Sequence, residues 1–130
     1  MIITDISVNQ IQAPQDNNAK SFVGRSGKLL IQIHTDEGIT GISEGSRNLK
    51  VFQAYLDDLI KPLLIGEDPT RTRKIWELLA LGKGQQATRF PSQIVGAIDV
   101  ALWDIAGKAA GMPIYQLLGG ARRTEIPLYW

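Results

Sequence analysis

Hydrophobic and polar residues alternate in three stretches of the early part of the chain, which is typical of strands with one buried side. Residues 2–12 form the first stretch, and its apolar side chains are expected on one side at Ile2, Ile6 and Val8. Leu29–Thr35 form the second stretch and Ile39–Glu44 the third. The turn Asp36-Glu37-Gly38 joins them, and its glycine can take the positive φ of a three-residue hairpin loop. The pattern predicts a small three-stranded antiparallel sheet.

Two features depart from this alternation. Residues 13–27 are polar and rich in Gly, Asn and Ser, and a loop of this length in a compact domain is often functional. Gly41 and Gly45 weaken the third strand and indicate a close approach of another element, or a bend.

After residue 48 the apolar period changes to that of helices. The first predicted helix carries Phe52, Leu56, Leu59 and Leu63 on one side, and Pro62 and Gly66 end it. Asp68-Pro69 is a helix start signal, with an aspartate N-cap followed by proline. The second helix then carries Ile75, Trp76 and Leu79 and ends at Gly82.

The third predicted helix runs from residue 92 to about residue 110 and has two apolar sides. A core-facing stripe at helical spacing consists of Ile94, Ile98, Leu102, Ile105 and Ala109. On another side Trp103 has small neighbours, namely Gly96, Asp99, Gly107 and Ala110. We expect a second body to approach that side closely. Gly111-Met112-Pro113 ends the helix, and Thr124–Trp130 is predicted as a further strand.

The order of strands followed by helices predicts an α+β fold, with a three-stranded antiparallel sheet followed by a helical bundle. The chain has 130 residues, 44% of them hydrophobic, a net charge of +1 and no cysteine. Charge therefore favours neither nucleic acid nor a membrane surface as a partner, and no apolar run is long enough to span a bilayer. Without cysteine there is no disulfide, thiolate metal site or cysteine nucleophile. A cytoplasmic location is the simplest interpretation.

Few side chains outside the loops suggest chemistry. The single histidine, His34, lies on a strand and is expected to be structural. Asp99 and Asp104 are about 140° apart around a helix, so they do not converge on one metal or proton. Asp104 precedes Lys108 by four residues and is expected to pair with it, while Asp99 is expected to anchor packing near Trp103.

Three motifs resemble a known family. They are AIDVALWDIAGK at 97–108 with GMP at 111–113 and LLGG at 117–120, TDEGITG at 35–41, and LIGEDP at 64–69. Together they resemble the enolase superfamily, in the mandelate racemase / muconate lactonizing enzyme group, and they span nearly the whole chain in order.

The resemblance implies an enolase-like N-terminal capping domain over residues 1–120 and the start of a (β/α) barrel at residues 121–130, with the rest of the barrel absent. In the family the barrel supplies the bases and the ligands of Mg²⁺, which stabilises the enolate formed when a proton is removed alpha to a carboxylate. The resemblance therefore implies a lyase or isomerase of the acid-sugar dehydratase or racemase type. No catalytic and no metal-binding residue is carried over to this chain, which we expect to be truncated and inactive alone.

The cap of such enzymes selects the substrate through loops that close over the barrel. The matching loops here are 14–27 and 45–48. The resemblance makes Phe22, Val23, Arg25 and Arg47 candidates for substrate binding: the cations suit a small carboxylate or acid sugar, and the apolar residues suit the wall of a lid. Lys20 is a weaker candidate. A cation on a loop is more often only solvated, so these assignments compete with a structural role.

Two partners follow from the resemblance: the barrel domain of the same enzyme, expected to dock on the Trp103 side, and further copies in a homo-oligomer. The alternative is a free-standing, non-catalytic α+β module. It would bind or assemble through the Trp103 side and the Tyr129-Trp130 end.

Overall fold

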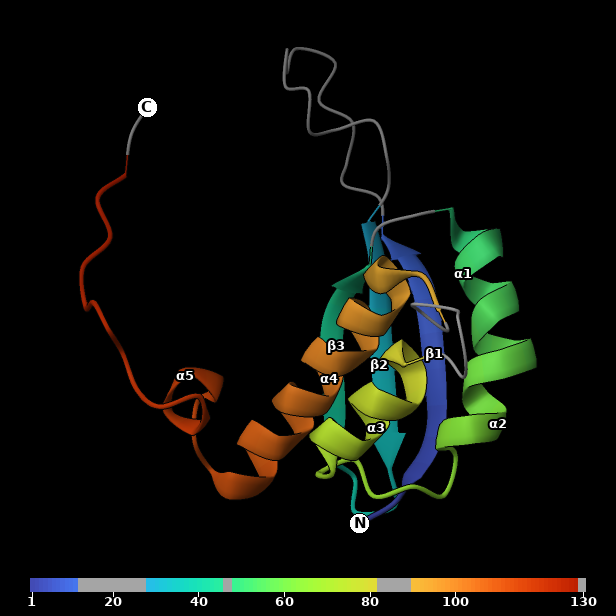
Figure 1. The fold of residues 1–130 in the computed structure, drawn as a ribbon, viewed down its shortest axis with the longest axis horizontal. Helices are drawn as coiled ribbons and strands as arrows, with labels where there is room; N and C mark the ends of the chain where they lie inside the picture. Colours follow the sequence, from blue (N-terminus) through green and yellow to red (C-terminus); the bar gives the residue numbers. More distant parts are fainter. Residues whose placement is uncertain (12–27, 46–47, 82–89, 129–130) are drawn as a thin grey trace.

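The computed structural model describes residues 1–11, 28–45, 48–81 and 90–128. β1 (Ile3–Ile11), β2 (Lys28–Thr35) and β3 (Thr40–Gly45) form one antiparallel sheet in the order β1-β2-β3. The helices follow in the chain, and all but the last of those described lie beside this sheet (Figure 1). The predicted α+β fold with a three-stranded antiparallel sheet and helices is confirmed.

β1 differs from the prediction at its start. Ile3, Ile6 and Val8 are buried, whereas Ile2 is exposed. The pairing of β1 with β2 shifts register between Ile3 and Asp5. A bulge of this kind adds a residue to one strand, so that Ile3 and Ile6, three positions apart, both face the core. Simple alternation from Ile6 therefore selected the wrong isoleucine.

The hairpin between β2 and β3 is confirmed. Gly38 has a φ of 78°, which a residue without a Cβ adopts at little cost. The Gly38 amide donates to the Thr35 carbonyl, and the Thr35 hydroxyl donates to the Ile39 carbonyl. These bonds close the turn and align the inner face of β2.

The first helical region consists of α1 (Leu49–Tyr55), the π-helical turn η1 (Leu56–Ile60) and α2 (Lys61–Leu64). Within it the Lys61 amide donates to Leu56, five residues back. The wider turn precedes Pro62, which has no amide hydrogen for a regular helical bond. It also keeps residues spaced by four on one side, so the buried set is Phe52, Leu56, Ile60 and Leu64.

The prediction of a regular period was therefore wrong at Leu59, which is 47% exposed because the π turn rotates it away from the core. Leu63 is partly buried and packs against the core. Sequence periodicity assumed 3.6 residues in each turn, and η1 has more.

α3 (Thr72–Ala80) begins later than predicted. Asp68 accepts hydrogen bonds from the Thr70 amide and hydroxyl, at 2.9 and 2.7 Å, so it caps a turn before the helix. Arg71 occupies the N-cap position and makes no side-chain cap bond. The hydroxyl and amide of Thr70 together hold the pKa of Asp68 below its usual range. Asp68 therefore organises the entry to α3 without being its N-cap.

α4 (Ser92–Ala110) is the long helix of the fold and ends at Gly111, whose φ of 63° is left-handed. The Gly111 and Met112 amides donate back to the Lys108 and Gly107 carbonyls, which confirms the predicted end. The predicted core stripe is buried except at Ala109, because the last turn extends past the edge of the sheet.

A single core joins these elements. α4 packs on β3 and β2, α3 packs on α4, and α1 and α2 pack on β1 (Figure 1). α5 (Ile114–Leu117) follows the end of α4, and residues 121–128 run on as exposed chain away from the sheet. The described residues 124–128 contain no strand, since they have no neighbouring strand to pair with. No described helix is long and apolar enough to cross a membrane.

Candidate functional site

The two loops proposed to bind substrate, 14–27 and 45–48, connect to the same end of the sheet. Ile11 pairs with Lys28, and Leu29 pairs with Gly45, so β1 ends, β2 begins and β3 ends at the same end of the sheet. This end, marked by Ile11, Lys28 and Gly45, is called the loop edge. Residues 12–27 and 46–47 are therefore both attached at this edge. The candidates Phe22, Val23, Arg25 and Arg47, like Lys20, lie outside the described residues, and their role in substrate binding stays a prediction.

The inner face of β3 is built from small residues. Gly41, Ser43 and Gly45 are buried and point toward the helices. A Cβ on Gly41 would lie 2.1 Å from the Ala101 carbonyl oxygen, so only glycine allows α4 to come this close. The Ser43 hydroxyl donates to the Ala97 carbonyl at 2.6 Å. The close approach predicted from the strand glycines is confirmed.

Asp104 and Lys108 tie the outer edge of β3 to α4. Asp104 accepts from the Lys108 ammonium at 2.6 Å and from the Ile42 amide at 2.8 Å. Lys108 also donates to the Thr40 carbonyl at 2.7 Å. The predicted pair is confirmed, and its wider role is to satisfy backbone groups on the edge strand. Because β3 and α4 are joined both at the inner face of the strand and along its outer edge, the rotation of α4 about its axis is set.

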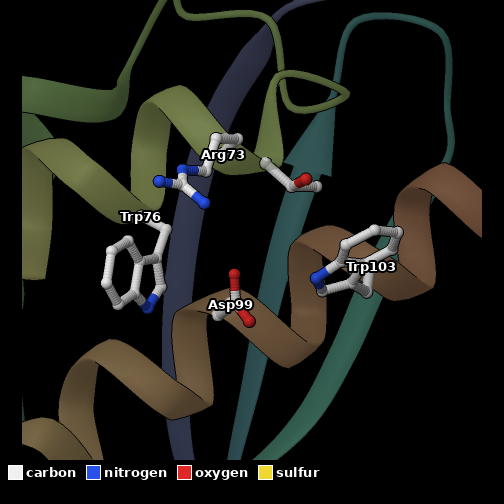
Figure 2. Close-up of a pocket in the computed structure, with 5 residues that line it drawn as sticks. Arg73, Trp76, Asp99 and Trp103 are labelled. Atoms are coloured by element: carbon white, nitrogen blue, oxygen red, sulfur yellow. The ribbon is translucent and has the colours of Figure 1, made fainter. Parts of the chain in front are cut away.

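That rotation places a pocket between α3 and α4. It has a volume of ≈ 230 Å³ and is lined by Thr72, Arg73, Trp76, Asp99 and Trp103. Figure 2 shows Asp99 between the two indoles, with its carboxylate pointing into the space between the helices. The nitrogen-bearing edge of each indole faces the Asp99 side. Asp99 therefore lies near Trp103, while its predicted role as an anchor of packing stays a prediction.

Asp99 is half-buried and makes no hydrogen bond or ion pair with any residue that the structure describes. Burial raises the pKa of its carboxyl group, because a charged group loses water there without gaining a compensating partner. By contrast Arg73 is committed elsewhere: its guanidinium pairs with Glu77 at 2.6 Å and lies 5.7 Å from the centre of the Trp76 ring. Among the described residues, Asp99 is thus an acceptor without a donor.

Sequence reasoning found only the α4 half of this pocket. It named Trp76 only together with Ile75 and Leu79 on the second helix, whereas this side chain is 39% exposed and forms a pocket wall. Thr72 and Arg73 carried no sequence signal for the pocket beyond their positions three or four residues before Trp76. Their meeting with Asp99 depends on how α3 crosses α4.

The Trp103 side of α4 is also less open than predicted at one end. Gly107 is buried, and a Cβ there would lie 2.8 Å from the Met112 carbonyl oxygen, so the chain itself covers this position. A Cβ on Gly96 would meet nothing, and Ala110 is exposed. The open stripe therefore runs through Gly96, Asp99, Val100 and Trp103.

The remaining polar candidates have structural surroundings. His34 lies on the open face of the sheet, with its ring nitrogens 3.5 Å from the Ser7 hydroxyl and 3.2 Å from the Thr40 hydroxyl. Within the described ranges no group of three or more His, Cys, Asp or Glu side chains is placed to hold a metal ion. Asp104 already has two donors. The described residues therefore do not fit a Mg²⁺ site.

The sequence and the fold of this chain match those of known proteins. Residues 4–119 match the family model of the mandelate racemase / muconate lactonizing enzyme N-terminal domain. The chain belongs to this family. The resemblance expected from the three motifs is thereby confirmed across nearly all of the sequence.

Relatives from several bacteria are similar to this cap. A D-galactonate dehydratase family member from Marinomonas sp. (strain MWYL1) is 42% identical over 116 residues, which are 86% of this chain and 29% of that protein. A D-mannonate dehydratase from Novosphingobium aromaticivorans is 41% identical over 78% of this chain and 26% of its own length. An enolase of the mandelate racemase subgroup from Agrobacterium tumefaciens superposes with a TM-score of 0.73 at 34% identity, covering 97% of this chain and 32% of that one.

The chain thus spans less than a third of each of these relatives. The match lies on the cap alone. The pocket between α3 and α4 and the loop edge of the sheet are therefore candidate functional sites.

Proposed function

We propose that this chain is the substrate-selecting cap of an acid-sugar dehydratase or racemase-like enzyme, which removes a proton alpha to a carboxylate. The observation that carries the proposal is the family match over residues 4–119, together with relatives named as dehydratases. The catalytic groups and Mg²⁺ then belong to a barrel domain, since the described residues of the cap fit no Mg²⁺ site. The chain alone is inactive on this proposal.

The loop edge of the sheet is where the cap would meet its substrate. Ile11, Lys28 and Gly45 lie there, and the two segments attached to them contain Arg25, Arg47 and the apolar pair Phe22 and Val23. We infer that the arginines pair with a carboxylate or hydroxyl groups of the substrate distant from the reacting carbon. The apolar pair excludes water when the loops close.

A chimera tests the proposal directly. Residues 1–120 replace the matching segment of the Marinomonas relative, and the product is assayed with Mg²⁺ for dehydration of D-galactonate and D-mannonate. We expect turnover by the chimera and none by the isolated chain. Arg25→Ala and Arg47→Ala in the chimera should raise KM more than they lower kcat, while Lys50→Ala, at an exposed cation on α1, serves as the control. Turnover by the isolated chain would contradict the proposal.

One observation bears on the alternative of a free-standing module. Leu118, Ile126 and Leu128 are 64%, 79% and 86% exposed, and large apolar side chains in such a state mark a surface that another body covers. We propose that this body is the barrel and that the complete enzyme is a homo-oligomer. Binding of a hydrophobic dye by the isolated chain is expected. A monomer that binds no dye and melts cooperatively would favour the free-standing module.

A further inference from the structure

The outward stripe of α4 combines exposure with an incomplete polar site. Gly96, Asp99, Val100 and Trp103 follow each other at helical spacing, and Val100 is 52% exposed in the middle of a helix of 19 residues. The stripe thus places an exposed apolar side chain beside a half-buried carboxylate that has no partner among the described residues. A ligand that matches this stripe would donate hydrogen bonds to the Asp99 carboxylate and pack against the indole rings beside it.

The shape of the pocket narrows the chemistry of that occupant. Its floor is the Asp99 carboxylate, which accepts hydrogen bonds only, and two of its walls are the indoles of Trp76 and Trp103 (Figure 2). A guanidinium is planar, carries five donors in a fork that matches a carboxylate, and stacks on aromatic faces. An ammonium would satisfy the charge but would use the flat walls less well.

We propose that the α3–α4 pocket is the receptor for an arginine side chain of the barrel domain, which pairs with Asp99 between Trp76 and Trp103. This inference rests on the proposed function for the source of the arginine. The relatives are more than three times as long as the matched segment, so each has a large further body to present such a side chain. The contact would fix the helices of the cap to the barrel.

The arginine already at the rim does not fill this role. Arg73 is held by Glu77 and by the ring of Trp76, and no contact with Asp99 is present. Its guanidinium instead lies over the Trp76 ring at the rim of the pocket. The negative charge of Asp99 therefore remains available to an incoming cation.

Binding of a guanidinium by the isolated chain is the first test. The Trp130→Phe chain is titrated with L-arginine amide, and the indole N–H signals of Trp76 and Trp103 are followed by NMR. We expect saturable shifts of both signals at millimolar concentration, as for a single contact, and a fall in the pKa of Asp99 on binding. L-citrulline amide, which has the same shape without the charge, should produce no saturable shift.

Variants separate the site from general charge effects. Asp99→Asn should weaken binding about tenfold or more, whereas Asp58→Asn, an exposed carboxylate on η1, should leave it unchanged. Arg73→Gln should leave binding equal or tighter. Dispersed spectra show that each variant is folded. Absence of saturable shifts, equal shifts with citrulline amide, or equal binding by Asp99→Asn would each overturn the proposal.

The chimera distinguishes the barrel from a free cation as the source. In an active chimera Asp99→Asn should lower the melting temperature and make the cap separate from the barrel more readily in urea, with little change in KM. An active chimera whose stability is unaffected by Asp99→Asn overturns this inference and leaves the proposed function standing. An inactive chimera with intact arginine binding by the cap argues against the proposed function instead.

Discussion

The two sides of α4 differ in how completely their groups are satisfied. On the sheet side, Ile98, Leu102 and Ile105 are fully buried, and Ala97 and Ala101 lie against the small residues of β3. On the other side, Asp99 has no donor within the described part of the chain, and Val100 is open to water. Of the two sides of α4, the sheet side is therefore the one whose groups are packed and bonded by residues that the structure describes.

The largest expected contrast comes from truncating one residue on each side. Leu102→Ala removes a fully buried side chain and should lower the free energy of unfolding by about 2–5 kcal/mol. Val100→Ala should change it by less than about 0.5 kcal/mol, because that side chain already contacts water. Urea unfolding followed by circular dichroism measures both. Equal losses would mean that the outward side is also packed in solution.

Glycine replacement sharpens the same contrast. Gly41→Ala forces a methyl group against the Ala101 carbonyl and the Ile105 side chain, and should cost about 1–3 kcal/mol of unfolding free energy. Gly96→Ala meets open space on a helix and should stabilise the chain by about 0.5–1 kcal/mol. Thermal melts of the two variants should therefore shift in opposite directions. A neutral Gly41→Ala would show that α4 can move away from β3.

The polar contact on the sheet side gives a smaller effect. Ser43→Ala removes the buried hydrogen bond to the Ala97 carbonyl and should cost about 1 kcal/mol, measured by urea unfolding. Ser7→Ala on the open face of the sheet is the control, since its contact with His34 is at 3.5 Å and only part-buried. If Ser7→Ala costs as much as Ser43→Ala, the hydrogen bond to α4 adds nothing specific.

The smallest effect concerns the unpaired carboxylate and depends on pH. Because the pKa of Asp99 is raised in the folded chain, folding disfavours its ionised form. That penalty is fully present above the folded pKa and is lost as the pH falls below the ordinary carboxyl value of 3.8. Asp99→Asn should therefore slightly stabilise the isolated chain at neutral pH, and the two melting temperatures should converge in acid. Destabilisation at neutral pH would mean that Asp99 has a partner within this chain.

Sequence pattern predicted most of the sheet and the core side of α4, because alternation and helical spacing report which side of an element is apolar. It failed where the backbone departs from ideal periods. The bulge near Asp5 moved the buried position from Ile2 to Ile3, and the π turn before Pro62 moved it from Leu59 to Ile60. Both irregularities add a residue locally, and a fixed period cannot detect that addition.

The candidate site also has features that the sequence predicted and features that it did not. The motifs predicted the family, and spacing alone predicted the pair Asp104–Lys108. The substrate-binding loops were also proposed from sequence, and they stay a prediction. The pocket wall formed by Trp76 was not foreseen, because helical spacing placed that residue with the buried Ile75 and Leu79.

The sequence by itself therefore determined the elements, their buried sides and the family of this cap, since each depends on residues near one another in the chain. Only the tertiary structure decided that Asp99 and Trp103 of α4 meet Trp76 of α3 around one pocket. Gly41 and Ser43 of β3 fix the position and rotation of α4, and this long-range packing turns its second side toward the place where a partner would bind. Local periodicity shows which side of α4 is apolar, but it does not show which residues of α3 face the other side.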